Sequence, residues 1–174
     1  MDRQAWDPTL RPARFADVPE LARLDRVCFP DHAYSPQLIL RFMELGLPCV
    51  VAEGPDGEVV GFSMVMPDAG EPTGLLVTLD VTPEARRRGL GTRMVRWCAR
   101  ALLETEPRPE LMWLTVATGN TGARTFYHSL GFSEVDSIEG YYGDDDAVVM
   151  VHGDLEELSG TRGAGRRDGG PSEI

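Results

Sequence analysis

The sequence predicts an α/β protein with a mixed sheet, and three of its patterns support this prediction. A turn, Gly54-Pro55-Asp56-Gly57, lies between two apolar stretches and indicates a β-hairpin. Farther along, residues 74–81, 89–104 and 111–117 have the patterns of a strand, an amphipathic helix and a strand. A hairpin followed by alternating strands and helices gives a mixed sheet, and we expect about seven strands and four helices.

Capping residues mark where the helices begin. Asp17 is placed to cap the first helix, with Glu20 as its capping-box partner. Ser35 is expected to cap the second helix and Asn120 the last one, which continues to residue 130. The remaining expected strands span residues 10–15, 48–53, 58–66, 132–137 and 147–152, the last two separated by the polar segment 139–146.

The two ends of the chain differ from the domain at residues 10–158. We expect residues 1–9 to be a flexible leader and residues 159–174 to be a disordered tail, because the tail is rich in Gly and Arg and almost free of apolar residues. No apolar stretch approaches the roughly 18 residues of a membrane span, and the start lacks the apolar core of a signal peptide. These features predict a cytoplasmic protein without a membrane partner.

Charge and cysteine content narrow the class of partner. The formal net charge is −11, which argues against nucleic acid and suits a cationic acceptor such as an amine. The three cysteines are widely spaced and form no Cys-x-x-Cys pair, so free thiols are expected. The three histidines show no metal-ligand spacing, and we expect no metal cofactor.

The segment after the strand at 74–81 has the pattern of an anion site. Arg86-Arg87-Arg88 and two glycines, Gly89 and Gly91, open an amphipathic helix. Glycines allow close backbone approach, and the amides at a helix N-terminus favour an anion such as a pyrophosphate. A Gly-Lys phosphate loop is excluded because all 17 basic residues are arginines, and the dinucleotide fingerprint has Met94 where it needs glycine.

Two motifs together indicate a family. Arg86-x-x-Gly89-x-Gly91 resembles the acetyl-CoA motif of the GNAT N-acetyltransferases, and the segment from Asn120 to Phe132 resembles their Asn-x-x-Ala-x-x-Phe-Tyr-x-x-x-Gly-Phe pattern. The resemblance covers roughly residues 10–152. It implies the GNAT fold, in which the fourth and fifth strands splay apart, and transfer of an acetyl group from acetyl-CoA to an amine, with coenzyme A as product.

The resemblance also implies roles for individual residues. The Val81 amide would polarise the thioester carbonyl, Asn120 would bond the pantetheine arm, and Tyr127 would protonate the leaving thiolate as general acid. The implied cofactor-binding residues are Leu79, Val81, Arg86, Arg87, Arg88, Gly89, Leu90, Gly91, Thr92 and Asn120.

A shorter match points to an acceptor. Tyr141-Tyr142 followed by Asp146-Ala147-Val148-Val149-Met150 resembles the ending of the bacterial ribosomal-protein N-terminal alanine acetyltransferases. In that subfamily the segment helps to form the groove for the acceptor peptide. Tyr141 and Tyr142 would line this groove, and Asp144 or Asp145 would face a cationic acceptor; the alternative is an ordinary hairpin tip with exposed acids.

One departure concerns the general base. That subfamily carries a glutamate in the fifth strand where this chain has Thr115, which cannot act as a base. Asp80 is the candidate replacement, a water held by Thr115 is a second possibility, and an enzyme without a strong base is a third. The last option suits an α-amine, which has a pKa about 2.5 units below that of lysine.

Several alternatives stay open. The segment 31–45 is expected to shape the acceptor pocket, with His32, Tyr34 and Phe42 as candidates. The acceptor is expected to be a protein or peptide N-terminus; a small-molecule amine, or an acetyl-CoA-binding module without turnover, would fit the same motifs. The sequence leaves the choice between monomer and homodimer open.

Overall fold

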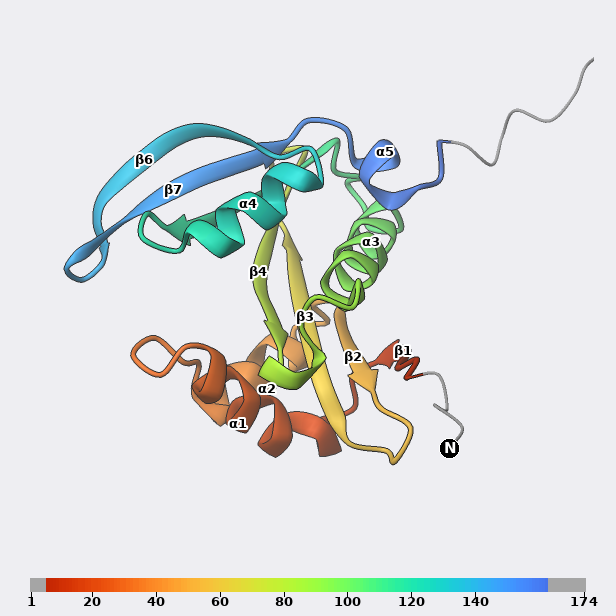
Figure 1. Ribbon diagram of the computed structural model, residues 1–174. Coiled ribbons are helices and arrows are strands. Elements are labelled where there is room, and N and C mark those ends of the chain that lie inside the picture. The colour runs from red at the N-terminus through yellow and green to blue at the C-terminus, as the bar shows by residue number, and fades with distance from the viewer. Residues whose placement is uncertain (1–5, 163–174) are drawn as a thin grey trace, which may run out of the picture.

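Residues 6–162 are described by a computed structural model, and a seven-stranded mixed sheet organises them (Figure 1). The strand order is β1-β2-β3-β4-β5-β7-β6, and β4–β5 is the parallel pair. The strands are β1 Thr9–Pro12, β2 Cys49–Glu53, β3 Val59–Pro67, β4 Thr73–Val81, β5 Leu111–Ala117, β6 Ser133–Tyr142 and β7 Asp145–His152. The α-helices are α1 Val18–Cys28, α2 Pro36–Glu44, α3 Leu90–Leu103, α4 Thr121–Ser129 and α5 Leu155–Ser159.

The parallel pair separates soon after it begins. β4 and β5 pair at three positions, from Thr73 opposite Leu111 to Leu75 opposite Trp113. Beyond Leu75, β4 stays paired with β3, whereas β5 continues alongside β7. Among the described strands, the remaining part of β4 therefore has no partner on the side that faces β5. This confirms the predicted splay and the predicted mixed sheet.

Each face of the sheet has its own core. Helices α1 and α2 pack on one face, around Leu21, Ile39 and Phe62, which are almost completely buried. Helix α3 packs on the other face, where Met94 and Leu102 are also buried, and α5 lies against it (Figure 1). The alternation of side chains along β4 explains the division, because successive residues of a strand point to opposite faces.

Two C-terminal features differ from the prediction. The segment 139–146, expected to separate the last two strands, is mostly strand, because β6 and β7 extend into it and leave a turn at Gly143-Asp144. A fifth helix, α5, was not predicted. This helix is short, and only a cap and two apolar residues mark it in the sequence. Asp154 Oδ1 accepts a hydrogen bond from the Glu157 amide at 2.9 Å, and Leu155 and Leu158 are buried.

The helix caps test the capping prediction directly. Ser35 Oγ accepts from the Leu38 amide at 3.2 Å, and Asn120 Oδ1 accepts from the Ala123 amide at 3.1 Å, so both of these caps are confirmed. The capping box of Asp17 with Glu20 is wrong. The Asp17 carboxylate does not bond α1; it accepts two hydrogen bonds from Arg11, at 2.8 and 2.9 Å, because this cation in β1 competes for it.

The ends of the described region contact the domain. Asp7 accepts a hydrogen bond from Arg93 at 2.8 Å, and Ser159 accepts one from Arg100 at 3.0 Å through its carbonyl oxygen. Residues 1–5 of the predicted leader and residues 163–174 of the predicted tail lie outside the described residues. Among residues 6–162, no helix combines the length and the apolar character needed to cross a membrane.

The ion pair between Arg11 and Asp17 gives a stability prediction. The hydrogen bonds from Arg11 hold the pKa of Asp17 below its usual range, so the pair stabilises the fold above that range and its contribution is lost as the pH falls through the folded pKa. Asp17→Asn should lower the free energy of unfolding by about 1–3 kcal/mol at neutral pH, and by less in acid. Urea unfolding at several pH values measures this.

Asp136→Asn is the matched control, because Asp136 is exposed on β6 and its carboxylate accepts from the adjacent Ser137 amide. It should change the free energy of unfolding by less than about 0.5 kcal/mol. If both variants lost the same free energy of unfolding, the ion pair of Arg11 with Asp17 would contribute no stability.

Candidate active site

The chain builds an open helix terminus directly after the separated part of β4. A 3-10 turn at Pro83–Ala85 leads into Arg87 and Gly89, which have φ angles of 59° and 78°. Gly89 caps α3 without a side-chain hydrogen bond. The first amides of a helix have no partner within it, so those of α3 are available to a ligand. Such a terminus favours an anion through both its amides and the helix dipole.

Glycine is needed at the two motif positions for different physical reasons. Gly89 is in the left-handed region, where a β-carbon is unfavourable. Gly91 allows close packing: a β-carbon there would lie 3.1 Å from Cζ of Phe126 in α4 and 3.8 Å from Leu79 Cδ2. The first turn of α3 therefore rests against α4 and the end of β4, and this contact fixes the position of the anion site.

The three arginines of the motif point in different directions. Arg86 Nε donates to the Val81 carbonyl at 3.0 Å, and Arg86 Nη2 lies 3.8 Å from the Cys28 sulfur. The Arg88 guanidinium stacks over the Trp6 ring at 4.6 Å, and the Arg87 side chain is exposed. Arg86 thus braces the end of β4, while the backbone of the loop faces the anion site.

Tyr127 is buried in α4. Its ring meets those of Phe126 and Phe132 edge-on, at 5.1 and 5.5 Å between centroids. Burial raises the pKa of the Tyr127 phenol, and the Asp80 carboxyl and the Tyr142 phenol raise it further. Tyr127, Asp80 and Tyr142 come from α4, β4 and β6, so three of the predicted site residues converge from separate elements.

The predicted acceptor residues also meet. Thr115 Oγ1 lies 2.9 Å from Tyr142 Oη, so the threonine that replaces the expected glutamate binds a predicted groove tyrosine. The Tyr142 ring contacts the rings of Tyr141 at 4.9 Å and His32 at 5.5 Å. Tyr34 lies farther along the same segment as His32 and packs edge-on against Phe42 at 5.7 Å.

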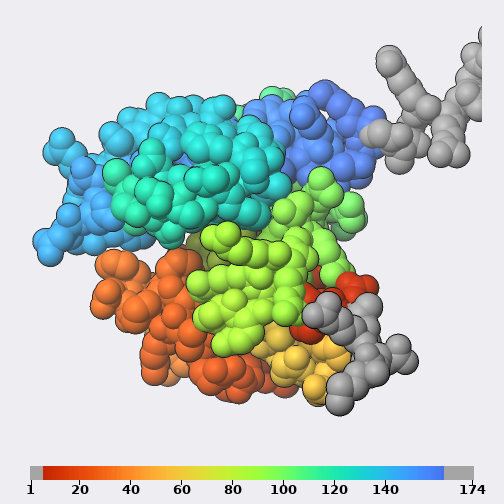
Figure 2. Space-filling view, in the orientation of Figure 1, coloured from red at the N-terminus to blue at the C-terminus, as the bar shows by residue number. Residues whose placement is uncertain are grey.

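An open cleft of about 510 Å³ lies between the α1–α2 connection and the β6–β7 hairpin. Figure 2 shows the hollow between the orange α1–α2 segment and the blue end of the hairpin. Its lining carries three carboxylates, one imidazole and one phenol. The lining residues are Asp31, His32, Tyr142, Gly143, Asp144 and Asp145. Asp31 was not among the predicted residues, because a single acid in a loop carries no pattern that separates it from a surface acid.

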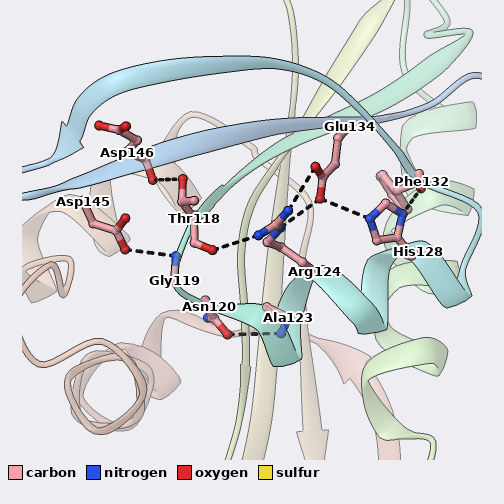
Figure 3. A network of polar contacts seen from close by, with 10 residues as sticks. All are labelled: Thr118, Gly119, Asn120, Ala123, Arg124, His128, Phe132, Glu134, Asp145 and Asp146. Carbon is pink, nitrogen blue, oxygen red and sulfur yellow. Dashed lines mark hydrogen bonds and ion pairs between the residues drawn. The ribbon is translucent and has the colours of Figure 1, made fainter.

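A polar network attaches α4 to the hairpin (Figure 3). Arg124 donates to both oxygens of Glu134, at 2.8 and 3.1 Å, and His128 lies 3.1 Å from the same carboxylate. The cap on α4 occupies Asn120 Oδ1 only, so the amide nitrogen of Asn120 stays available for a ligand. This network was missed in the sequence, because its members belong to different elements.

Comparison with known proteins identifies the family. A model of the acetyltransferase (GNAT) family matches residues 17–132. The chain belongs to this family. Members of the GNAT family use acetyl-CoA as the acetyl donor, and the chain has the fold and both motifs of an N-acetyltransferase.

The relatives fall into two groups. An N-alpha-acetyltransferase of Sulfurisphaera tokodaii is 32% identical, over 82% of this chain and 90% of the relative. The ARD1 subunit homolog of an N-terminal acetyltransferase complex in Dictyostelium discoideum is 30% identical, over 82% and 71%. The ribosomal protein bS18-alanine N-acetyltransferase of Salmonella typhimurium is 32% identical over 55% of this chain and 65% of the relative.

The solved structures agree on the fold. Ard1 from Thermoplasma volcanium superposes with a TM-score of 0.74 at 24% identity, covering 83% of this chain and 96% of the other. The seven-stranded sheet with its separated parallel pair is therefore the GNAT fold.

The left-handed position at Gly89 gives a prediction about the donor. Gly89→Ala should weaken acetyl-CoA binding roughly 10-fold, because an alanine in the left-handed region is strained by about 1–2 kcal/mol and the loop would move to relieve it. Isothermal titration calorimetry measures the dissociation constant.

Gly57→Ala is a matched control in the β2–β3 turn. Gly57 has a φ of 82°, and at Gly57 as at Gly89 an added β-carbon would meet no described atom within 4 Å. The control carries the same backbone strain away from the loop and should bind acetyl-CoA like the wild type. Equal binding by the two variants would contradict a role of the Gly89 loop in holding the donor.

Proposed function

We propose that the protein transfers the acetyl group of acetyl-CoA to the α-amine of a protein or peptide N-terminus. The observation that carries the proposal is the acidic cleft between the α1–α2 connection and the β6–β7 hairpin, whose lining residue Tyr142 contacts Thr115 of β5. Asp31, Asp144 and Asp145 give this entrance a negative charge that attracts a cationic terminus. The named activities of the relatives support the same acceptor class.

The donor would lie in the gap between β4 and β5. Amides of the Gly89 loop and of the first turn of α3 would bind its pyrophosphate. The free edge of β4 would bind the pantetheine arm at Leu79 and Val81, since an unpaired strand edge offers amide and carbonyl groups in register. The Asn120 amide group is the remaining side-chain contact proposed for this arm.

The reaction would be a direct attack of the neutral amine on the thioester carbon. The carbonyl oxygen gains negative charge as the new C–N bond forms, and the Val81 N–H would stabilise it. The C–S bond then breaks, and the thiolate takes a proton. Because burial raises the pKa of Tyr127, the phenol stays neutral and acts as a hydrogen-bond donor that gives up its proton only as the thiolate leaves.

The threonine at position 115, in place of a glutamate base, favours an α-amine over a lysine side chain. Thr115 cannot accept a proton at neutral pH, and its hydroxyl is bonded to Tyr142. About 10% of an α-amine is already neutral at pH 7, compared with less than about 0.1% of a lysine amine, a difference of roughly 3.5 kcal/mol. An enzyme without a strong base therefore works more readily on an N-terminus.

The finer assignment is a ribosomal-protein N-terminal alanine acetyltransferase. It is supported by the Tyr141-Tyr142 pair, which lies beside the cleft and contacts His32 across it. The Salmonella relative carries that activity, while the archaeal relative matches more of this chain. An acceptor with alanine as its first residue is therefore one member of the acceptor panel.

The acceptor class is tested by acetyl-CoA turnover with free-thiol detection. We expect turnover of peptides with a free α-amine and none of the same peptides with the α-amine blocked, because a lysine amine is too basic for a site without a strong base. The panel contains lysine peptides and small amines as controls. Turnover of a small amine alone, or of the blocked lysine peptides, would contradict the proposal.

Tyr127→Phe tests the leaving-group step. It should lower kcat roughly 100-fold and change the dissociation constant of acetyl-CoA less than about 2-fold, since the phenol acts on the sulfur only as the C–S bond breaks. Phe132→Leu is the packing control, because Phe132 is the other ring that packs edge-on against Tyr127. An unchanged kcat in the Tyr127 variant would remove Tyr127 from the mechanism.

A further inference from the structure

Two carboxyl groups lie in contact beneath the active site. Asp25 comes from the last part of α1 and Asp80 from β4, and their side chains are 1% and 0% exposed. The two carboxyls lie close enough to interact, and each one shifts the pKa of the other. Two buried carboxyls this close avoid a clash of charges if one of them carries a proton, which it can donate to the other.

The remaining contacts favour Asp80 as the carrier of that proton. Asp80 Oδ2 accepts from Thr78 Oγ1 at 2.7 Å, while Oδ1 is buried and finds no donor within residues 6–162. Asp25 Oδ2 accepts from the Tyr34 amide at 2.5 Å. A protonated Asp80 that donates to Asp25 satisfies the orphaned oxygen and leaves Asp25 as the charged acceptor. Burial raises the pKa of both carboxyls, and the charge of Asp25 raises that of Asp80 further.

The pair connects the two halves of the candidate site. Tyr34 is the penultimate residue of the segment 29–35, which also carries Asp31 and His32 of the cleft. Asp80 lies between Leu79 and Val81, the strand positions assigned to the donor. The chain from Tyr34 N–H through Asp25 to Asp80 therefore ties the cleft segment to the donor strand.

We propose that Asp25 and Asp80 are positioning residues that share one proton and so hold the segment 29–35 over the acceptor cleft. The effect of this segment on acceptor binding rests on the proposed function. Loss of the shared proton would place two negative charges in contact inside the protein, and their repulsion would release the segment. The acceptor site is thus intact below the upper pKa of the pair and weakens as the pH rises through it.

The ionisable groups around the pair keep their charge states near neutral pH, so the pair is the unit expected to titrate. Burial, with a smaller effect of the Asp80 carboxyl, raises the pKa of the Cys28 thiol to about 11, so the thiol stays neutral near pH 7. The Cys49 thiol and the phenols of Tyr34 and Tyr127 have raised pKa values as well. The cation Arg86 contacts Cys28 and the Val81 carbonyl. The ionisable groups whose pKa values the pair affects are Cys28, Tyr34, Cys49 and Tyr127.

Asp80→Asn separates a positioning role from a role as base. The amide donates to Asp25 as the protonated acid does, and it cannot ionise. Asp80→Ala removes the donor altogether. The KM for an N-terminal peptide and kcat are measured for both variants and the wild type from about pH 5 to pH 9, and taking ratios at each pH cancels the titration of the peptide amine.

The ratio of the wild-type KM to the KM of Asp80→Asn should rise roughly 10-fold toward alkaline pH. Asp80→Ala should have a higher KM than the wild type at every pH below that rise. Asp56→Asn, an exposed change in the β2–β3 turn, should follow the wild type. A kcat that falls 100-fold or more in Asp80→Asn at every pH, with KM unchanged, would make Asp80 a proton acceptor and overturn the proposal.

Hydrogen exchange of the segment 29–35 gives a readout that needs no substrate. At alkaline pH its amides should exchange faster in the wild type than in Asp80→Asn, and at acidic pH equally fast. The Tyr34 amide should show the largest difference. Equal exchange at all pH values would reject the positioning role, even if the acceptor were a different amine; a difference without any peptide turnover would reject only the proposed acceptor.

Discussion

The separation of β4 from β5 is the constraint on which the rest of the molecule depends. An open strand edge in the middle of a sheet leaves backbone amides and carbonyls without partners, an arrangement that proteins normally avoid. Here each strand is held from its other side, β4 by β3 and β5 by β7. The sheet thus keeps its gap without losing its core, and a ligand with amide groups can enter as a substitute strand.

Side-chain contacts hold the two halves at a fixed separation around this gap. On the proposed donor side, Gly91 brings α3 against Phe126 of α4, whose ring packs against that of Tyr127. On the acceptor side, Thr115 bonds Tyr142, which ties β5 to the end of the hairpin. The cleft is defined by short polar contacts at its rim rather than by a deep apolar core.

The parts of this arrangement that are local in sequence could be predicted. The bounds of β5 and the caps at Ser35 and Asn120 follow from periodicity and from hydrogen bonds between residues three positions apart. The cap at Asp17 failed for the opposite reason, because a cation from another element took the carboxylate. The pairing of Asp25 with Asp80 is equally non-local, and no periodicity of α1 or β4 distinguishes those acids from surface acids.

The same non-local contact changes the interpretation of the missing glutamate. Asp80 is the carboxyl that the sequence offers as a replacement base, but it is fully buried, and with the proton that we propose it shares with Asp25 it would not accept one from an amine. In the proposed mechanism Thr115 does not act as a base either, so the amine would have to arrive largely neutral. Such a requirement would select acceptors by their own pKa and would favour N-termini before any side chain of the acceptor is recognised.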